Sequence, residues 1–192
     1  MTGAPPGQLP RTAFDHAPYY CEENVWRLAR HEAFAGRDAC VLVITNRARA
    51  CVFWDQRAAE TPGSAVVWDY HVVLLDRSPP AGAWRVWDLD SVLPFPCPAD
   101  EYLRRTFRDV DAIDPELAPR FRVVTAHRYV ETFASDRRHM VRADGSWAAP
   151  PPAWEAIRTA TEVHTLDRML DVTDESAGVT LDLATARARF GA

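Results

Sequence analysis

The 192-residue sequence contains no lysine, so all 22 of its basic side chains are arginines. This absence excludes P-loop phosphate binding, Schiff-base and pyridoxal-phosphate chemistry, and serine–lysine dyads, because each of them requires a lysine amine. Long apolar runs are absent as well, and the longest aliphatic stretches are the four-residue segments 41–44 and 72–75. The sequence therefore predicts neither a signal peptide nor a transmembrane span.

Basic charge is also scarce relative to acidic charge, with 22 basic and 27 acidic residues and a formal net charge of -5. No block of basic residues stands out, so we expect neither nucleic acid nor a membrane as a partner. Hydrophobic residues make up 47% of the chain and charged residues 26%, which is typical of globular proteins. This length favours a single domain over residues 1–192, with residues 1–18 as an extended N-terminal arm rich in proline and glycine.

Cysteine is sparse, and its four positions are Cys21, Cys40, Cys51 and Cys97. They form no CxxC pair and no cluster with histidine at metal-ligand spacing, so we expect no metal site. In a cytoplasmic protein these thiols stay reduced, which leaves one of them free for chemistry.

The hydrophobic periodicity predicts both helices and strands. Helices are expected at 22–35, 99–110, 127–135, 164–172 and 183–190, and strands at 39–45, 50–54, 65–77, 84–90 and 121–126. We expect the first two strands to form a hairpin across residues 46–49, and 65–77 to pair with 84–90 as a central hairpin. Residues 135–152 are expected to form a long surface loop.

Cys21 comes immediately before a predicted helix. Unpaired N–H groups and the helix dipole at such a position lower the pKa of a thiol and can donate to the oxyanion of a tetrahedral intermediate. The neighbouring Glu22 and Glu23 suit a first helical turn, but their charges would raise the pKa of the thiol again. The alternative is a buried, inert cysteine.

His71 lies within a strongly β-forming segment. Strand alternation puts Asp69 and His71 on one face and Trp68 and Tyr70 on the other. Taken alone, His71 fits a hydrogen-bonded core histidine better than a catalytic one.

Asp88 and Asp90 share a face of the facing segment, and either carboxylate is a candidate to accept the Nδ1–H of His71 and hold the ring as a general base. Alternation does not choose between them. The order Cys, His, Asp is the one found in papain-like and transglutaminase-like enzymes.

Five segments, in order, closely resemble the protein N-terminal glutamine amidohydrolase family. They are YYCEENVWRL (19–28), WDYHVVLLDR (68–77), WDLDSVLPFPC (87–97), FRVVTAHRYVETFASDRRHM (121–140) and a tryptophan followed by a proline run (147–152). The likeness extends from about residue 19 to the end of the sequence. It implies an α+β, papain/transglutaminase-like single catalytic domain, in which an antiparallel sheet packs against helices and the nucleophile lies at a helix N-terminus. It also implies the triad Cys21, His71 and Asp88, with Asp90 as a structural neighbour.

The family resemblance implies a cofactor-free thiol amidohydrolase that converts an N-terminal glutamine to glutamate and releases ammonia through a thioester on Cys21. Its expected partners are peptides and proteins with a free N-terminal glutamine, and we expect a cytoplasmic monomer. A buried carboxylate would read the substrate α-ammonium. Glu22, Glu23 and Asp69 are the candidates for this role, and Glu23 and Asp69 are preferred. Trp68 and Tyr70 are candidates to shape the pocket. The alternatives are solvated glutamates and aromatic side chains that serve only the core.

Two other functions remain open. One is a related cysteine acyl-transfer enzyme, namely an internal-glutamine deamidase, a transglutaminase or a protease. The other is a non-catalytic peptide-binding module that uses the seven tryptophans and the 135–152 loop. Residues 134–140 either have a role near the active site or form a solvated, charged loop. The glutamate product would destabilise target proteins only in a cell that has an N-degron pathway.

Overall fold

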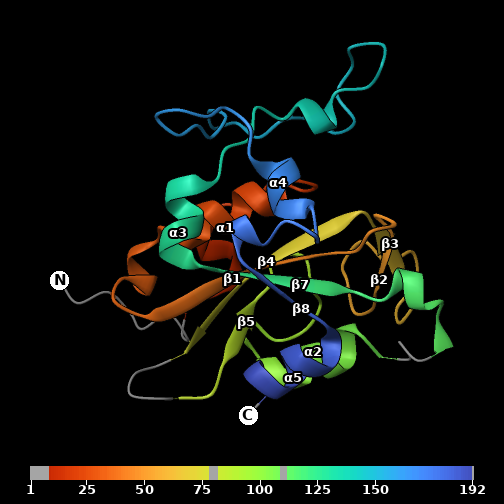
Figure 1. Ribbon diagram of the computed structural model, residues 1–192. Helices are drawn as coiled ribbons and strands as arrows, with labels where there is room; N and C mark the ends of the chain where they lie inside the picture. Colours follow the sequence, from red (N-terminus) through yellow and green to blue (C-terminus); the bar gives the residue numbers. More distant parts are fainter. Residues whose placement is uncertain (1–8, 78–81, 109–111, 192) are drawn as a thin grey trace.

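The computed structural model describes residues 9–77, 82–108 and 112–191 (Figure 1). A six-stranded antiparallel sheet forms its centre, in the order β6-β5-β4-β1-β7-β8. The strands are β1 (Asp38–Thr45), β4 (Tyr70–Arg77), β5 (Arg85–Trp87), β6 (Cys97–Pro98), β7 (Arg120–Thr125) and β8 (Val179–Leu181). The expected pairing of the central hairpin is confirmed by β4 and β5, whereas most of its turn, residues 78–81, lies outside the described residues.

Helices cover both faces of this sheet (Figure 1). They are α1 (Cys21–Ala29), α2 (Ala99–Thr106), α3 (Ala126–Thr132), α4 (Leu166–Leu170) and α5 (Leu183–Phe190). Alternate β1 side chains enter two separate cores, because neighbouring strand residues point to opposite faces. Val41 and Val43 pack with residues of α1, α3 and α4, while Leu42 and Ile44 pack with residues of α2 and α5. The result is an α+β fold with an antiparallel sheet between two helical layers.

The expected hairpin between 39–45 and 50–54 is wrong. β1 pairs with β4 on one side and β7 on the other, and the next strand, β2 (Cys51–Phe53), pairs with β3 (Val66–Trp68) in a separate two-stranded sheet. The side chain of Asn46 bonds to both the N–H and the C=O of Ala50, which closes a turn after β1. The chain therefore leaves the central sheet, and strands distant in sequence fill both sides of β1.

The expected single strand 65–77 is divided at Asp69 into β3 and β4. The break changes the side-chain alternation, so the prediction that Trp68 lies on the face opposite His71 is wrong. The two rings lie side by side, with centroids 4.9 Å apart. Tyr70, Val72 and Leu74 pack in the core beneath α1, as the alternation within β4 predicts.

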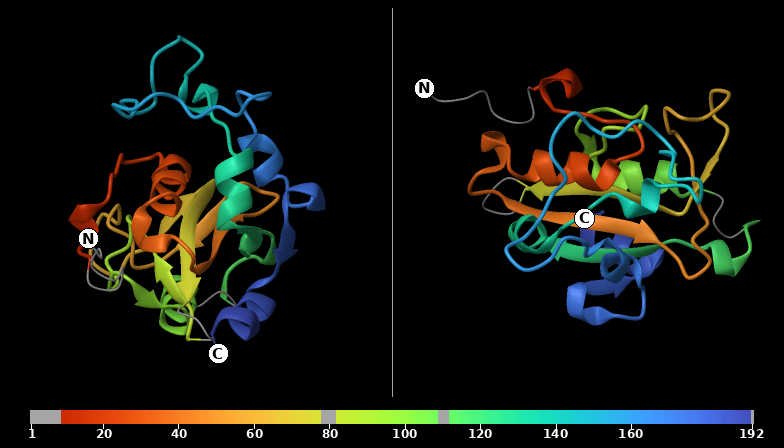
Figure 2. Two further views of the ribbon diagram at one scale, coloured as in Figure 1. Left: turned by 90° about the vertical axis from the view of Figure 1, so that its left-hand side faces the viewer. Right: turned by 90° about the horizontal axis from the view of Figure 1, so that it is seen from above.

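Helix α1 packs over β4 and is shorter than the predicted helix at 22–35 (Figure 2). It ends at Ala29, and a short 3-10 turn follows at Glu32–Phe34. Other short 3-10 turns occur at Arg11–Ala13, Pro115–Leu117, Arg138–Met140 and Glu175–Ala177. Helices α2 and α3 likewise end before their predicted limits. Residue 110, the expected end of α2, lies outside the described residues, and so do residues 1–8 of the expected arm. Among the described residues, no helix has the length and apolar character needed to cross a membrane.

Candidate active site

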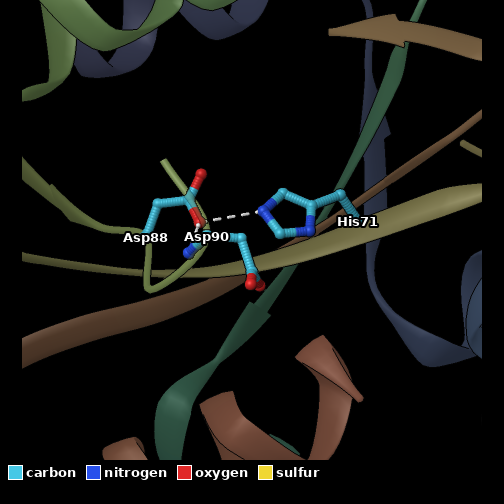
Figure 3. Close-up of side chains that lie close together, drawn as sticks. All are labelled: His71, Asp88 and Asp90. Carbon is cyan, nitrogen blue, oxygen red and sulfur yellow. Dashed lines mark hydrogen bonds and ion pairs between the residues drawn. The ribbon is translucent and has the colours of Figure 1, made fainter. Parts of the chain in front are cut away.

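Three elements bring the predicted triad residues to one region. Cys21 is the first residue of α1, His71 is the second residue of β4, and Asp88 directly follows β5. The Nε2 atom of His71 lies 3.0 Å from Oδ1 of Asp88. Figure 3 draws this contact as a dashed line. The expectation that His71 uses Nδ1 for this bond is therefore wrong. Because Asp88 holds Nε2, Nδ1 is the nitrogen left to exchange a proton with a thiol or a substrate.

Asp88 is buried and bound on both oxygens. Its Oδ2 accepts a hydrogen bond of 2.7 Å from the Tyr102 hydroxyl, and its Oδ1 accepts one of 2.9 Å from the backbone N–H of Asp90. Burial alone would raise the pKa of Asp88, but the charge and hydrogen bond of His71, together with these donors, lower it. Tyr102 is a residue that the sequence reasoning missed, because it looks like any core aromatic on an amphipathic helix.

His71 responds in the opposite direction. Burial would lower the pKa of the imidazole, but the charge of Asp88 and the hydrogen bond between the two side chains more than offset this effect, so the pKa of His71 is raised. The Asp88 carboxylate therefore both orients the ring and strengthens it as a base.

The Cys21 thiol does not have the lowered pKa expected from its position at the helix N-terminus. Burial and then the Glu22 carboxylate, whose Oε2 is 3.7 Å from the sulfur, raise the pKa of Cys21 well above its usual value. A hydrogen bond from the backbone N–H of Val72 opposes this rise. The position of Cys21 at a helix N-terminus therefore does not by itself make its thiol acidic.

The other three cysteines differ from Cys21 in their surroundings. Cys40, Cys51 and Cys97 are buried in the core next to α2 and α5, and burial raises the pKa of each of these thiols to about 12. Cys21 is only partly buried and faces a cavity. Among the described cysteines, it alone is both accessible and close to a histidine–carboxylate pair.

The cavity beside Cys21 has a volume of about 410 Å³. Besides Cys21, four other residues that the sequence predicts for the site line this cavity, namely His71, Trp68, Asp69 and Tyr70. The remaining lining residues are His16, Pro18, Tyr19, Arg57, Ala58, Asp90, His139 and Met140. His139 and Met140 belong to the 134–140 segment, so this segment contributes to the cavity wall.

Glu22 lies fully buried behind this wall. Its Oε2 accepts a hydrogen bond of 3.0 Å from the Tyr70 hydroxyl, and its Oε1 is 3.4 Å from Nε2 of His139. The Tyr70 hydroxyl is also 3.3 Å from the same nitrogen. A carboxylate, a phenol and an imidazole therefore form a second polar cluster in contact with Cys21. The sequence analysis considered these residues one by one but did not predict that they meet.

Glu23 is also fully buried, so the alternative of two solvated glutamates is wrong. Both of its oxygens bind the Arg137 guanidinium, at 2.7 and 2.8 Å, and Oε2 accepts a third bond of 2.7 Å from the Trp154 indole. Arg137 has a left-handed backbone, with φ 65°, and its side chain is buried. The structure does not bring Glu23 to the cavity, because its carboxylate anchors the loop between α3 and α4.

Asp90 lines the cavity and pairs with Nε2 of His16 at 2.8 Å. Figure 3 shows its side chain next to His71 and Asp88, and potential ligand atoms of these three residues lie within 4.8 Å of one another. Both Asp88 oxygens already accept hydrogen bonds from His71 and Tyr102. The Asp88 carboxylate, whose oxygens could otherwise bind a metal ion, is therefore used to hold the His71 imidazole.

A partly accessible thiol, a histidine fixed by a buried carboxylate and an adjoining cavity make up the kind of site that thiol-dependent acyl transfer requires. Comparison with known proteins agrees with this class. A model of the N-terminal glutamine amidase family matches residues 16–190, and the chain belongs to this family.

Curated relatives carry the name protein N-terminal glutamine amidohydrolase. The chain is 36% identical over 191 residues to the one from Homo sapiens, an alignment that covers 97% of this chain and 92% of the relative. It is 37% identical over 174 residues to the one from Bos taurus, covering 88% and 83% of the two chains. For the relative from Arabidopsis thaliana, the identity is 36% over 191 residues, covering 95% and 86%. The family resemblance expected from the five sequence segments is confirmed.

Proposed function

We propose that this protein hydrolyses the side-chain amide of an N-terminal glutamine in peptides and proteins, giving glutamate and ammonia. The observation that carries the proposal is that Cys21 and His71 line one cavity while Asp88 holds His71 from behind at 3.0 Å. The relatives' name gives the reaction this site serves. The arrangement also supports a papain/transglutaminase-like fold for the domain.

The roles of the three residues follow from their contacts. Nδ1 of His71 takes the thiol proton as the Cys21 sulfur attacks the amide carbon, and the same imidazole then gives that proton to the departing ammonia. A thioester remains on Cys21. Water, deprotonated by His71, hydrolyses the thioester to glutamate and restores the thiol.

The oxyanion of each tetrahedral intermediate forms next to the start of α1. The first backbone N–H groups of a helix have no intrahelical acceptor, and Cys21 is the first helical residue. Its N–H is therefore available to the oxyanion, and one such donor is typically worth about 3 kcal/mol in the transition state. The nucleophile and the oxyanion donor are thus parts of one residue.

Selection for an N-terminal residue requires a group that reads the free α-ammonium. Asp69 suits this role because it lines the cavity and because the described partner of its carboxylate is a neutral group, the N–H of Tyr70, at 3.0 Å from Oδ1. Glu23 is engaged by Arg137, and Asp90 is paired with His16. Trp68 and Tyr70, on either side of Asp69, complete this part of the wall.

We also propose that the enzyme acts as a cytoplasmic monomer, as a single catalytic domain. The free state of all four cysteines agrees with a reducing compartment. A gel-filtration mass equal to that of one chain is the expected result for the oligomeric state.

A panel of short peptides tests the proposed reaction. Peptides that begin with Gln, acetyl-Gln or Asn, or that carry an internal Gln, are incubated with the protein and analysed by mass spectrometry, with enzyme-free samples to correct for spontaneous pyroglutamate formation. We expect conversion of the free N-terminal Gln peptide alone, with ammonia released without any added amine. Equal conversion of acetyl-Gln or internal Gln would favour a general deamidase, dependence on an added amine would favour a transglutaminase, and cleavage of the backbone would favour a protease.

A variant tests the role of Asp69. Asp69→Asn removes the charge but keeps the shape, so we expect slower conversion of the Gln peptide and a smaller preference for it over acetyl-Gln. Asp100→Asn, which changes an exposed carboxylate on α2, is the matched control. An unchanged preference in Asp69→Asn would assign the ammonium to another group.

A further inference from the structure

One wall of the cavity is apolar and belongs to residues outside the triad. Pro18 and Tyr19 precede the nucleophile, and Met140 comes from the loop between α3 and α4. All three line the cavity that contains Cys21.

Tyr19 stands out in this wall because of both its backbone and its exposure. Its φ is 71°, in the left-handed region that bulky residues rarely adopt. Its side chain is 71% exposed, whereas the adjacent Tyr20 is fully buried and its hydroxyl donates to the carbonyl of Ala149. Tyr19 therefore lies at the edge of the cavity, whereas Tyr20, the residue after it, lies in the core. Backbone strain of this kind is concentrated at functional sites.

The cavity also has more room than one glutamine side chain needs. A glutamine side chain has five heavy atoms, which occupy roughly 150 Å³ at about 30 Å³ for each atom, the volume of a water molecule in the liquid. The cavity of about 410 Å³ therefore has space for a further group. In a substrate, the nearest such group is the second residue, whose Cα lies about 3.8 Å from that of the glutamine.

We propose that Tyr19, with Pro18 and Met140, forms a subsite for the second residue of the substrate and favours aromatic and large aliphatic side chains there. This inference rests on the proposed function. An exposed tyrosine ring offers a flat apolar surface to such a side chain, and packing against it removes both surfaces from water. Arg57 lines the same cavity and is exposed, so a preference for an acidic second residue is the competing outcome.

The test is a series of peptides Gln-X-Ala-Ala in which X is Phe, Leu, Gly or Glu. We expect kcat/KM of the wild type to be about tenfold higher for Phe and Leu than for Gly, as for a single apolar contact. Tyr19→Ala should remove this difference, measured as the ratio of kcat/KM for the Phe peptide to that for the Gly peptide within the same variant, and Tyr19→Phe should preserve the ratio. Trp147→Ala is the matched control, because Trp147 is an exposed aromatic outside the cavity lining.

Three results would overturn the subsite. Equal rates for all four peptides in the wild type would do so without any variant, and so would a preference that survives in Tyr19→Ala. The highest rate on the Glu peptide would instead assign the second position to Arg57. Each of these results leaves the proposed reaction standing, whereas failure of the wild type to convert any of the peptides would overturn the reaction and the subsite together.

Discussion

Nε2 of His71 and Oδ1 of Asp88 lie 3.0 Å apart in the interior of the protein, and both side chains are almost completely buried. The pair joins the second residue of β4 to the residue that follows β5, so the pairing of these two strands sets its geometry. The Tyr102 hydroxyl on the second oxygen of Asp88 keeps the carboxylate from turning. The imidazole is thereby fixed before any substrate arrives, which is the preorganisation that general-base catalysis requires.

Asp88→Asn should alter both the rate and its pH dependence. In the proposed mechanism neutral His71 takes the thiol proton, so the acidic limb of kcat/KM should follow the pKa of His71. Asp88 raises that pKa and burial lowers it, so removing the charge should move the limb to lower pH. We also expect the plateau rate to fall by roughly 100-fold or more, since the ring loses its partner.

The measurement is kcat/KM on a Gln peptide as a function of pH, with the exposed Asp100→Asn as the control. An acidic limb that stays at the wild-type pH in Asp88→Asn would contradict the role assigned to this carboxylate.

Glu22→Gln should lower the pKa of the Cys21 thiol. Burial and the Glu22 carboxylate raise that pKa, and the neutral amide removes the second cause while its oxygen can still accept the hydrogen bond from Tyr70. The rate of alkylation of Cys21 by iodoacetamide should therefore begin to rise at a lower pH than in the wild type. Glu116→Gln, at an exposed position, serves as the control, and coincident pH profiles for wild type and Glu22→Gln would show that Glu22 does not act on the thiol.

The pair formed by Glu23 and Arg137 should stabilise the fold through charge compensation. Glu23→Gln leaves a buried guanidinium without its carboxylate, so we expect the free energy of unfolding to fall by about 3–5 kcal/mol. Arg137→Met should cost a similar amount, and the double variant should cost less than the sum of the two.

Chemical denaturation measures these differences. The exposed pair Glu162 and Arg168 provides the control, because surface ion pairs contribute at most about 1 kcal/mol. If Glu23→Gln cost no more than Glu162→Gln, the loop between α3 and α4 would be held by other contacts.

The sequence predicted the parts of the site that depend on local order. A cysteine at a helix start and a histidine within an apolar strand can be recognised from neighbouring residues, and the family segments then selected Asp88 over Asp90. The partners of Glu23 could not be predicted in this way, because Arg137 is 114 residues away and reaches it only in the folded chain.

The fold shows the same limit. Alternation correctly put Tyr70 on one face with Val72 and Leu74, but it failed for Trp68, because the strand breaks at Asp69 and the phase changes there. The hairpin expected after β1 failed for a different reason. Two distant strands, β4 and β7, take both edges of β1, and a local pattern carries no information about such pairing. The raised pKa of Cys21 likewise depends on burial, which only the tertiary structure supplies.

The most direct test of the account compares the wild type with Cys21→Ala on one peptide that begins with a free glutamine, by mass spectrometry and by ammonia release. Cys21 is only partly buried at the edge of a cavity, so the variant should fold, with a free energy of unfolding within about 1 kcal/mol of the wild type. We expect complete conversion to glutamate by the wild type and none above the enzyme-free rate by the folded variant. Conversion by Cys21→Ala at a rate near that of the wild type would contradict the assignment of Cys21 as the nucleophile.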